Sequence, residues 1–275
     1  MLKIAIIGAG TLLGRELVDT LEARDCSVLP LSHGPMTRDE EFADLVMFAP
    51  EASLLEGMDL VLLAETPAAP ELLDGFPGRV LDLRDAPEAS LDPMPLVGGW
   101  PQGKLALRGR PALEQVLGTV PRLVSGLGEV SGTHLQSVAH LGDLGVDGLM
   151  EQSAAVFKGE DPDITTLGFR AAFEVVPRVP RGRLVQVQVP VFHGDLLILH
   201  LRAAPGQSLA RQEALTGVQG VEWRDVPPTS REVAVSPFLL AHFTPADDGQ
   251  AGVLILGFDP ILWGVLMPIL RLLEL

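Results

Sequence analysis

The sequence contains a single cysteine, Cys26, so no disulfide can form within the chain, a composition that suits a reducing compartment. Basic residues are also few, because 20 Lys and Arg stand against 36 Asp and Glu, for a net charge of −16. Binding to nucleic acid requires a basic face, so this charge argues against a nucleic-acid partner. The apolar run at residues 4–10 is too short for a secretory signal, and we expect a cytoplasmic protein.

Uninterrupted apolar runs of membrane-spanning length are missing as well. The nearest is GVLILGFDPILWGVLMPILRLL, which begins at Gly252. A membrane span needs about 20 apolar residues, and this stretch is interrupted by Asp259, Pro260, Pro268 and Arg271. The pattern therefore predicts a buried strand followed by a packed helix, and no membrane partner.

The first part of the chain alternates apolar strand patterns with helical spacing. Such alternation is typical of parallel βαβ units with right-handed crossovers, which predicts a Rossmann-type α/β domain at residues 1–122. The predicted elements are strands at Leu2–Ile7, Ser27–Leu31, Asp59–Ala64 and Arg79–Leu83, and a helix at Leu12–Ala23.

The pattern changes in the second part, where strands follow one another with fewer helices between them. This favours an α+β domain with a mostly antiparallel sheet at residues 123–259, and a closing helix at residues 260–275 that packs back on the first domain. The predicted elements are a helix at Val146–Phe157 and strands at Arg183–Val191, Leu196–Ala203, Arg231–Ser236 and Gly252–Phe258.

The turn GAGTLLG after the first strand is the candidate cofactor site. Glycines after a strand let the backbone approach a phosphate, and the helix that follows offers its N-terminal amides to an anion. The last glycine, Gly14, comes one residue later than in the ordinary dinucleotide-binding pattern. The candidate cofactor-binding residues are Gly8, Gly10, Thr11, Leu12 and Leu13.

Over nearly its whole length the chain resembles the aspartate-semialdehyde dehydrogenase family, through six motifs in the family's order. GAGTLLG looks like the family's glycine-rich turn, RVLDLRDA like its Asp-containing strand end, and LQSVAHLGDLGVDGLMEQ like its Gln-Ser-Val-Ser segment with the following helix. AAFEVVP looks like the family's Ala-Phe-Asn-x-x-Pro, QVPV like its Arg-Val-Pro-Val, and DPILWG like its closing Asp-Asn-Leu-x-x-Gly. The resemblance implies a nucleotide-binding domain, a second domain for catalysis and dimerisation, and NADP or NAD as the cofactor.

The resemblance also implies a cysteine thiolate as the nucleophile, because a thiolate both attacks an aldehyde and leaves readily. The family places this cysteine four residues before a glutamine, at the start of a helix, and the similar stretch here is LRGRPALEQVL. With Gln115 as the anchor, the nucleophile position falls on Pro111, or on Ala112 one residue away, and neither can attack. Cys26 lies far from this stretch and is interpreted as a structural thiol.

Two other family positions carry different chemistry in this chain. The arginine that would grip a substrate carboxylate looks like Gln188, and the histidine base of a Gly-His pair looks like Asp195. His193, two residues earlier, is expected to share the strand face of Asp195 and is a weak candidate for a replacement base. Pro111, Gln188 and Asp195 are therefore interpreted as vestigial active-site positions, with no catalytic residue retained.

The residues after the second strand do not indicate whether NAD or NADP would bind. An acid after the second strand would hold a ribose, and an arginine would accept a 2′-phosphate, but the chain offers Ser32 and His33, with Arg38 as the nearest arginine. Two interpretations stay open, namely retained dinucleotide binding and an empty turn kept for packing. The histidines show no spacing typical of a metal site, so we expect no metal.

Together these observations favour a catalytically inactive homologue that acts as a dimeric binding or scaffold protein. The first alternative is an NAD(P)-dependent aldehyde dehydrogenase or reductase of amino-acid biosynthesis, with His193 or His140 as the acid. The second alternative is a nucleotide or anion sensor that uses residues 8–14.

Overall fold

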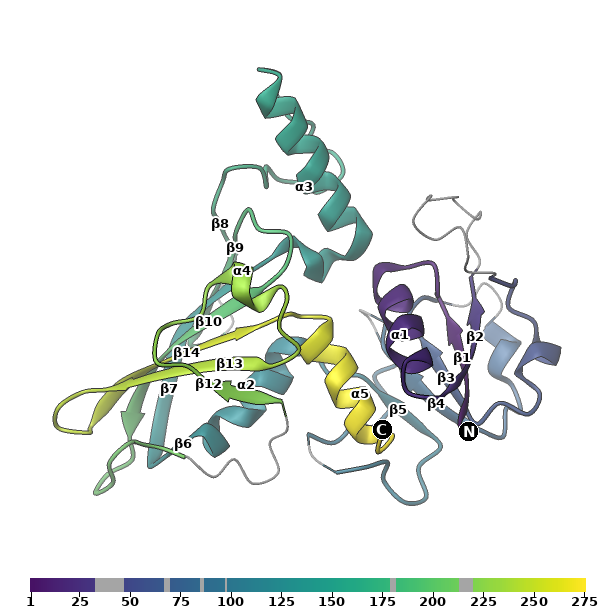
Figure 1. The fold of residues 1–275 in the computed structure, drawn as a ribbon, viewed down its shortest axis with the longest axis horizontal. Helices are drawn as coiled ribbons and strands as arrows, with labels where there is room; N and C mark the ends of the chain where they lie inside the picture. The colour runs from purple at the N-terminus through teal and green to yellow at the C-terminus, as the bar shows by residue number, and fades with distance from the viewer. Residues whose placement is uncertain (33–46, 67–69, 85–86, 97, 179–181, 213–219) are drawn as a thin grey trace. The chain divides into compact units, whose positions relative to one another are not determined.

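The computed structural model describes residues 1–32, 47–66, 70–84, 87–96, 98–178, 182–212 and 220–275. The chain divides into two compact units, the first formed by residues 1–111 and 268–275 and the second by residues 112–267. Figure 1 shows the strands and helices of both units. No helix within the described ranges is long and apolar enough to cross a membrane.

The first unit is built on a parallel sheet of five strands in the order β2-β1-β3-β4-β5, as the alternating pattern predicts. Its central strands are almost completely buried, because α1 and apolar side chains from short 3-10 turns cover them. The elements are β1 (Lys3–Ile7), α1 (Leu12–Glu22), β2 (Ser27–Leu31), η2 (Ala52–Leu55), β3 (Leu60–Leu63), η3 (Pro70–Leu73), β4 (Arg79–Asp82) and β5 (Ala106–Arg108).

The strand order places a topological switch point between β1 and β3, where neighbouring connections leave the sheet in opposite directions. Ligands of open α/β sheets bind outside the carboxyl ends of the strands at such a point. The turn that begins at Gly8 follows β1 directly, and Glu65 follows β3, so both lie at this edge. The fold therefore puts the candidate cofactor turn where a nucleotide would be expected.

The second unit is built on a mixed sheet of seven strands in the order β12-β13-β14-β10-β7-β9-β8. Only the β7–β9 and β12–β13 pairs are parallel, so the predicted mostly antiparallel sheet is confirmed. The strands of this sheet are β7 (Leu127–Gln136), β8 (Val176–Pro177), β9 (Leu184–Gln188), β10 (Asp195–Ala203), β12 (Val221–Trp223), β13 (Leu239–Pro245) and β14 (Ala251–Phe258). A separate two-stranded sheet is formed by β6 (Val124–Ser125) and β11 (Ala210–Arg211).

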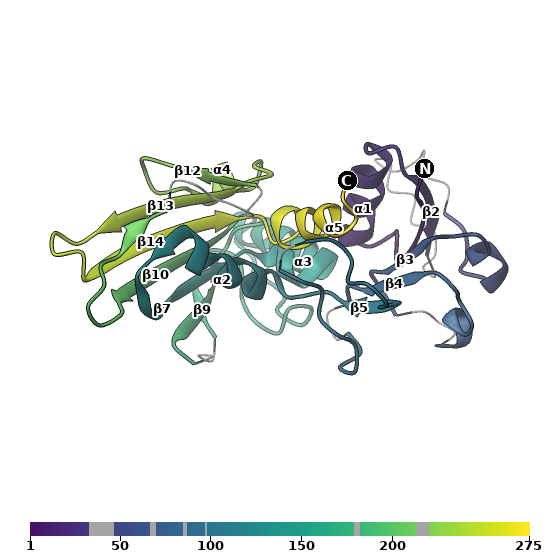
Figure 2. The same cartoon turned by 90° about the horizontal axis from the view of Figure 1, so that it is seen from below.

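One face of this sheet is covered by α2 (Ala112–Leu123), as Figure 2 shows. Val116 and Val120 of α2 pack against Leu197, Leu199 and the neighbouring strands in one buried cluster. The other helical segments of the unit are η4 (Val138–Leu141), α3 (Gly142–Phe157), α4 (Ser230–Val233) and the π-helical turn η5 (Leu262–Leu266), and α5 (Met267–Leu272) leads back into the first unit.

One predicted strand is wrong, and two strands of the sheet were not predicted. The predicted strand at Arg231–Ser236 is wrong, because the segment forms α4. A capping box decides this, in which Thr229 accepts from the Glu232 amide while the Glu232 carboxylate accepts from the Thr229 amide. The interior strands β7 and β13 were not predicted at all, although both pair on two sides.

Candidate functional site

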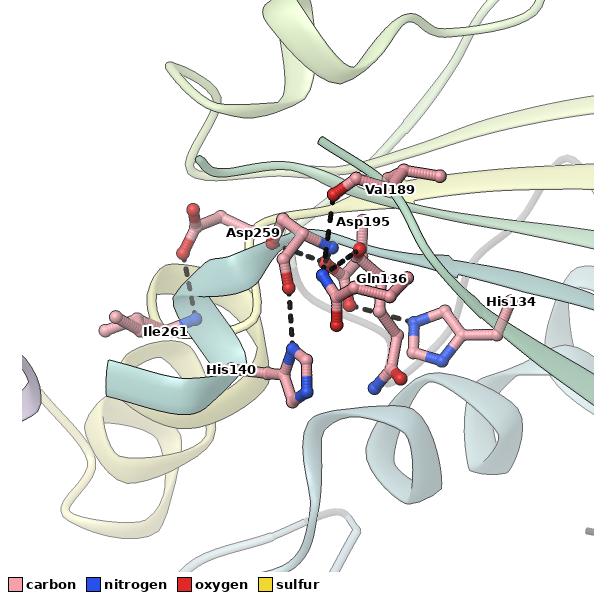
Figure 3. Close-up of polar contacts among 9 residues, drawn as sticks. His134, Gln136, His140, Val189, Asp195, Asp259 and Ile261 are labelled. Carbon is pink, nitrogen blue, oxygen red and sulfur yellow. Dashed lines mark hydrogen bonds and ion pairs between the residues drawn. The ribbon is translucent and has the colours of Figure 1, made fainter. Parts of the chain in front are cut away.

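Polar side chains gather at one end of the seven-stranded sheet, on the face that α2 covers. Gln136 pairs with Gln188 across β7 and β9, and Leu197 of β10 lies opposite His134 of β7. Because side chains alternate along a strand, His134, Gln136, Gln188 and Asp195 all project to the same side. We call these four residues the strand-end cluster, and Figure 3 labels three of them, His134, Gln136 and Asp195.

Asp195 is the centre of the strand-end cluster and is 1% exposed. Its Oδ1 accepts from the Ser137 amide at 2.8 Å and from the Ser137 hydroxyl at 2.6 Å. Its Oδ2 lies 2.8 Å from Nε2 of His134, whose ring stacks on Phe258 at 5.8 Å between centroids. The three donors hold this buried carboxylate in place.

Gln188, which the resemblance places where the family has an arginine, is fully buried and also held in place. Its Nε2 donates to the Gln136 carbonyl at 2.8 Å, which fixes the orientation of the side-chain amide. The structure thus brings Gln188 and Asp195 into one cluster, two strands apart. The amide carries no charge, so it cannot clamp a carboxylate as a guanidinium does.

Two buried polar atoms of the strand-end cluster and one of α2 have no hydrogen-bond partner among the described residues. They are Nδ1 of His134 and Oε1 of Gln188 in the cluster, and Nε2 of Gln115 in α2. Gln115 lies on the buried side of α2, next to Val116, which packs in the core against Leu197. Because a buried polar atom without a partner is costly, each of these atoms requires an explanation.

Two further histidines lie close to the cluster, on segments that pair through the backbone amides of residues 138 and 139. His140 donates from Nδ1 to the Ser137 carbonyl at 2.6 Å, so its Nε2 carries the lone pair. His193 was expected on a strand, sharing a face with Asp195, and this is wrong. It lies in the loop before β10, and its Nδ1 is 3.2 Å from Oδ2 of Asp259, whose Oδ1 caps Ile261.

The expected nucleophile positions hold no reactive side chain. Pro111 is exposed and directly precedes α2 in the chain. Ala112, the first residue of α2, lies against Gly264 so closely that a side chain at Gly264 would collide with it. Cys26 follows α1 in the first unit and is buried. Burial raises the pKa of its thiol and the Asp25 carboxylate raises it further, which disfavours the reactive thiolate.

The glycine-rich turn makes internal contacts that explain its sequence. Gly8 adopts φ +96° against Glu65, and a side chain at Gly14 would collide with the Gly8 carbonyl. Thr11 caps α1 by accepting from the Gly14 amide at 3.0 Å, while Arg15 donates to the Gly10 carbonyl at 2.6 Å. Packing and capping therefore account for these residues without a ligand.

Leu12 and Leu13 begin α1, where their amides face the N-terminal end of the helix. Ser32 lies against Gly10, with its Oγ 3.0 Å from where a side chain at that glycine would begin. His33 and Arg38, the other residues considered for the ribose and its phosphate, lie outside the described residues. In the described ranges no three His, Cys, Asp or Glu side chains form a group that could hold a metal ion.

His134, Ser137 and Asp259 are the residues of this region that sequence reasoning missed. His134 lies within LGEVSGTHLQ, whose glycines and polar residues hide a strand. His134 and Asp195 are 61 residues apart, so only the strand register brings them together. For Asp259 a sequence signal exists, because it is the acidic residue of DPILWG and lies two and three residues before Ile261 and Leu262, whose amides donate to its Oδ1.

At the sequence level, no protein-family model and no curated protein matches this chain. Its fold, however, is similar to those of solved structures over nearly the full length. Aspartate semialdehyde dehydrogenase II of Vibrio cholerae, solved in complex with ASA, is 16% identical with a TM-score of 0.76, covering 99% of this chain and 97% of that one.

Two further structures give the same result. A probable aspartate-semialdehyde dehydrogenase of Pseudomonas aeruginosa is 20% identical with a TM-score of 0.77, covering 98% of this chain and 97% of that one. The aspartate semialdehyde dehydrogenase of Francisella tularensis is 14% identical with a TM-score of 0.74, covering 100% and 99%. The chain therefore has the fold of these dehydrogenases, and at such identity the likeness concerns the fold alone.

Proposed function

We propose that this chain is a non-catalytic relative of aspartate-semialdehyde dehydrogenase that acts by binding. The observation that carries the proposal is the state of Asp195, a buried carboxylate held by three donors where the resemblance implies a histidine base. Gln188 and Pro111 support it, because the one is neutral and the other has no nucleophilic atom. Losing the nucleophile alone removes many orders of magnitude of rate from such an enzyme.

The test is phosphate-dependent reduction of NADP with aspartate semialdehyde, followed by absorbance and compared with an active dehydrogenase from a solved relative. We expect no turnover from this chain. We also expect none from Pro111→Cys or Ala112→Cys, because the base and the carboxylate clamp would still be missing. Robust turnover by the wild type would refute the proposal, and recovery in either variant would show that the pocket has been misplaced.

One observation favours a second candidate, an NAD(P)-dependent reductase that works without a covalent intermediate. A histidine oriented by a carboxylate is a common acid–base device, and His193 with Asp259 has that geometry. Such an enzyme would lose activity in His193→Gln while keeping its affinity for the dinucleotide. This candidate, like a nucleotide sensor, requires that the turn at residues 8–14 binds a dinucleotide.

We further propose a homodimer, in line with the resemblance. The face of the seven-stranded sheet opposite to α2 bears half-buried apolar residues such as Ile198 and Ile255, and charges of both signs in Glu129, Arg183 and Arg202. A surface with apolar and oppositely charged groups can be self-complementary about a two-fold axis. Light scattering on a sizing column should give about twice the 29.3 kDa of one chain.

A further inference from the structure

We propose that the strand-end cluster binds a small ligand rich in N–H or O–H donors, such as a primary ammonium or hydroxyl compound, in place of a carboxylate or phosphate. This inference rests on the proposed binding function and names the ligand class for that same site. Two observations support it. They are the buried hydrogen-bonding atoms of the cluster that have no partner among the residues that the structure describes, and the negative charge of Asp195 beside them.

The atoms left over are mostly acceptors. Nε2 of His134 donates to Oδ2 of Asp195, so in the neutral imidazole the buried Nδ1 is an acceptor without a partner in the described part of the chain. In Gln188 the nitrogen is engaged with the Gln136 carbonyl, so the buried Oε1 is the acceptor that remains. Both side chains are at least 98% buried, and their orientation is fixed by the hydrogen bond at the other end.

Partly buried groups extend the same set toward solvent. Nε2 of His140 carries a lone pair, because Nδ1 donates to the Ser137 carbonyl. Figure 3 shows the imidazoles of His134 and His140 and the side chain of Gln136 projecting to the same side of the sheet. The set therefore matches a ligand that donates several hydrogen bonds.

Charge points in the same direction. Asp195 places a carboxylate within the cluster, and none of the residues that form it is Lys or Arg. An anion brought beside Asp195 would be repelled in a region of low dielectric constant, where charge interactions are strong. A cation or a neutral hydroxyl compound meets no such penalty. The substitution of a guanidinium by Gln188 thus reverses the preference that the resemblance implies.

The probe is ethanolamine, which carries an ammonium and a hydroxyl group, with succinate and phosphate as the anionic probes. Long-range ¹H–¹⁵N spectra report each imidazole separately. We expect ethanolamine to shift the His134 and His140 resonances in a saturable way, and the two anions to leave them unchanged. His242 is the internal control, because both of its ring nitrogens already have partners on the protein.

A matched pair of variants locates the site. Gln188→Met removes the buried acceptor, whereas Gln207→Met makes the same change in an exposed turn. We expect about tenfold weaker ethanolamine binding in the first and unchanged binding in the second, as for one lost hydrogen bond. If Gln188→Met does not fold, His140→Phe serves, and it too should weaken binding.

The proposal is overturned if ethanolamine gives no saturable shift at tens of millimolar, which would leave water as the occupant, or if an anion binds in its place. It is also overturned if Gln188→Met or, when that variant is unfolded, His140→Phe binds as tightly as the wild type. These readouts do not depend on turnover. If the protein oxidises the aldehyde, the non-catalytic function is refuted and the result on ethanolamine binding is unaffected. If the protein neither binds ethanolamine nor oxidises the aldehyde, only the proposed ligand class is refuted.

Discussion

Asp195 stabilises the end of the seven-stranded sheet as well as defining the candidate site. It links β10 to β7 through His134 and to the following segment through Ser137. Removal of one member of such a buried hydrogen-bond network lowers stability, because the other members are left without hydrogen-bond partners. Asp195 thus fixes His134 and Ser137 relative to β10.

Asp195→Ala should therefore lower the free energy of unfolding by about 3 kcal/mol or more, since three buried donors lose their acceptor. Urea denaturation of the variant and the wild type measures this. Asp225→Ala is the control, because Asp225 is exposed and its replacement should change stability by about 0.5 kcal/mol or less. Equal effects of the two substitutions would contradict the role given to Asp195.

Asp82 makes the first unit sensitive to acid. Burial alone would raise the pKa of its carboxyl group, but hydrogen bonds from Arg84 and from the amides of Glu88 and Arg84 outweigh burial and lower the pKa. A lowered native pKa stabilises the fold above the ordinary value of about 3.9, and this contribution is lost as the pH falls through the native value.

Asp82→Asn should consequently cost about 1–2 kcal/mol near neutral pH, and the difference from the wild type should shrink as the pH falls below about 4. Thermal denaturation across a pH series provides the measurement. Asp74→Asn changes an exposed carboxylate in the same unit and should show no such trend. A constant difference at all pH values would mean that the Asp82 charge does not stabilise the fold.

At the scale of elements, local capping competes with the strand pattern. REVAVS alternates polar and apolar residues, which indicates a strand, but Thr229 and Glu232 close a capping box and start α4. Glu232 also pairs with Arg224, and Val233 turns inward against Gly257. One short helix thus covers the sheet where alternation alone would have placed another strand.

Thr229→Ala should destabilise the protein by about 1 kcal/mol, because the Glu232 amide loses its cap. Ser230→Ala, at the first helical position, lacks that bond and should be close to neutral. Chemical denaturation of both variants tests this. The capping box would be without energetic importance if the two variants were equally stable.

The strand β7 shows why the pattern of one segment is insufficient. Its sequence has two glycines and no regular alternation, yet it is an interior strand that pairs with β10 and β9. At Gly132 the Ile198 carbonyl comes so close that a side chain would collide with it. The segment is a strand because its neighbours supply the hydrogen bonds, which no local signal records.

At the scale of the whole molecule, the first unit has a Rossmann-like parallel sheet, and the turn after its first strand makes hydrogen bonds within the chain. Thr11 takes up the Gly14 amide, and Glu65 puts an acidic residue against Gly8 at the switch point. An acid there opposes a pyrophosphate, and a helix N-terminus with fewer open amides attracts it less.

We therefore expect NAD, NADP and their reduced forms to leave the melting temperature unchanged at millimolar concentration. A ligand at 100 times its dissociation constant would add about 2.7 kcal/mol to the free energy of unfolding, which a thermal-shift titration detects readily. A dehydrogenase from a solved relative is the positive control. A clear shift with any dinucleotide would favour the reductase or sensor alternatives.

The sequence by itself determined the layering of the molecule. Apolar runs such as Ile4–Ile7 and Leu60–Leu63 can only be buried, and their alternation with helical spacing leads to a parallel sheet. It also pointed, through the resemblance, to Pro111, Gln188 and Asp195 as positions without the expected chemistry, and their role stays a prediction.

Only the tertiary structure decided which groups meet at the site. His134 joins Asp195 because β7 and β10 pair in one register, and a shift of one residue would turn His134 to the opposite face. His193 lies in the loop before β10 and not in the strand, and its Nδ1 contacts Oδ2 of Asp259. Register and loop geometry depend on contacts between residues far apart in the chain, and a local pattern carries no record of them.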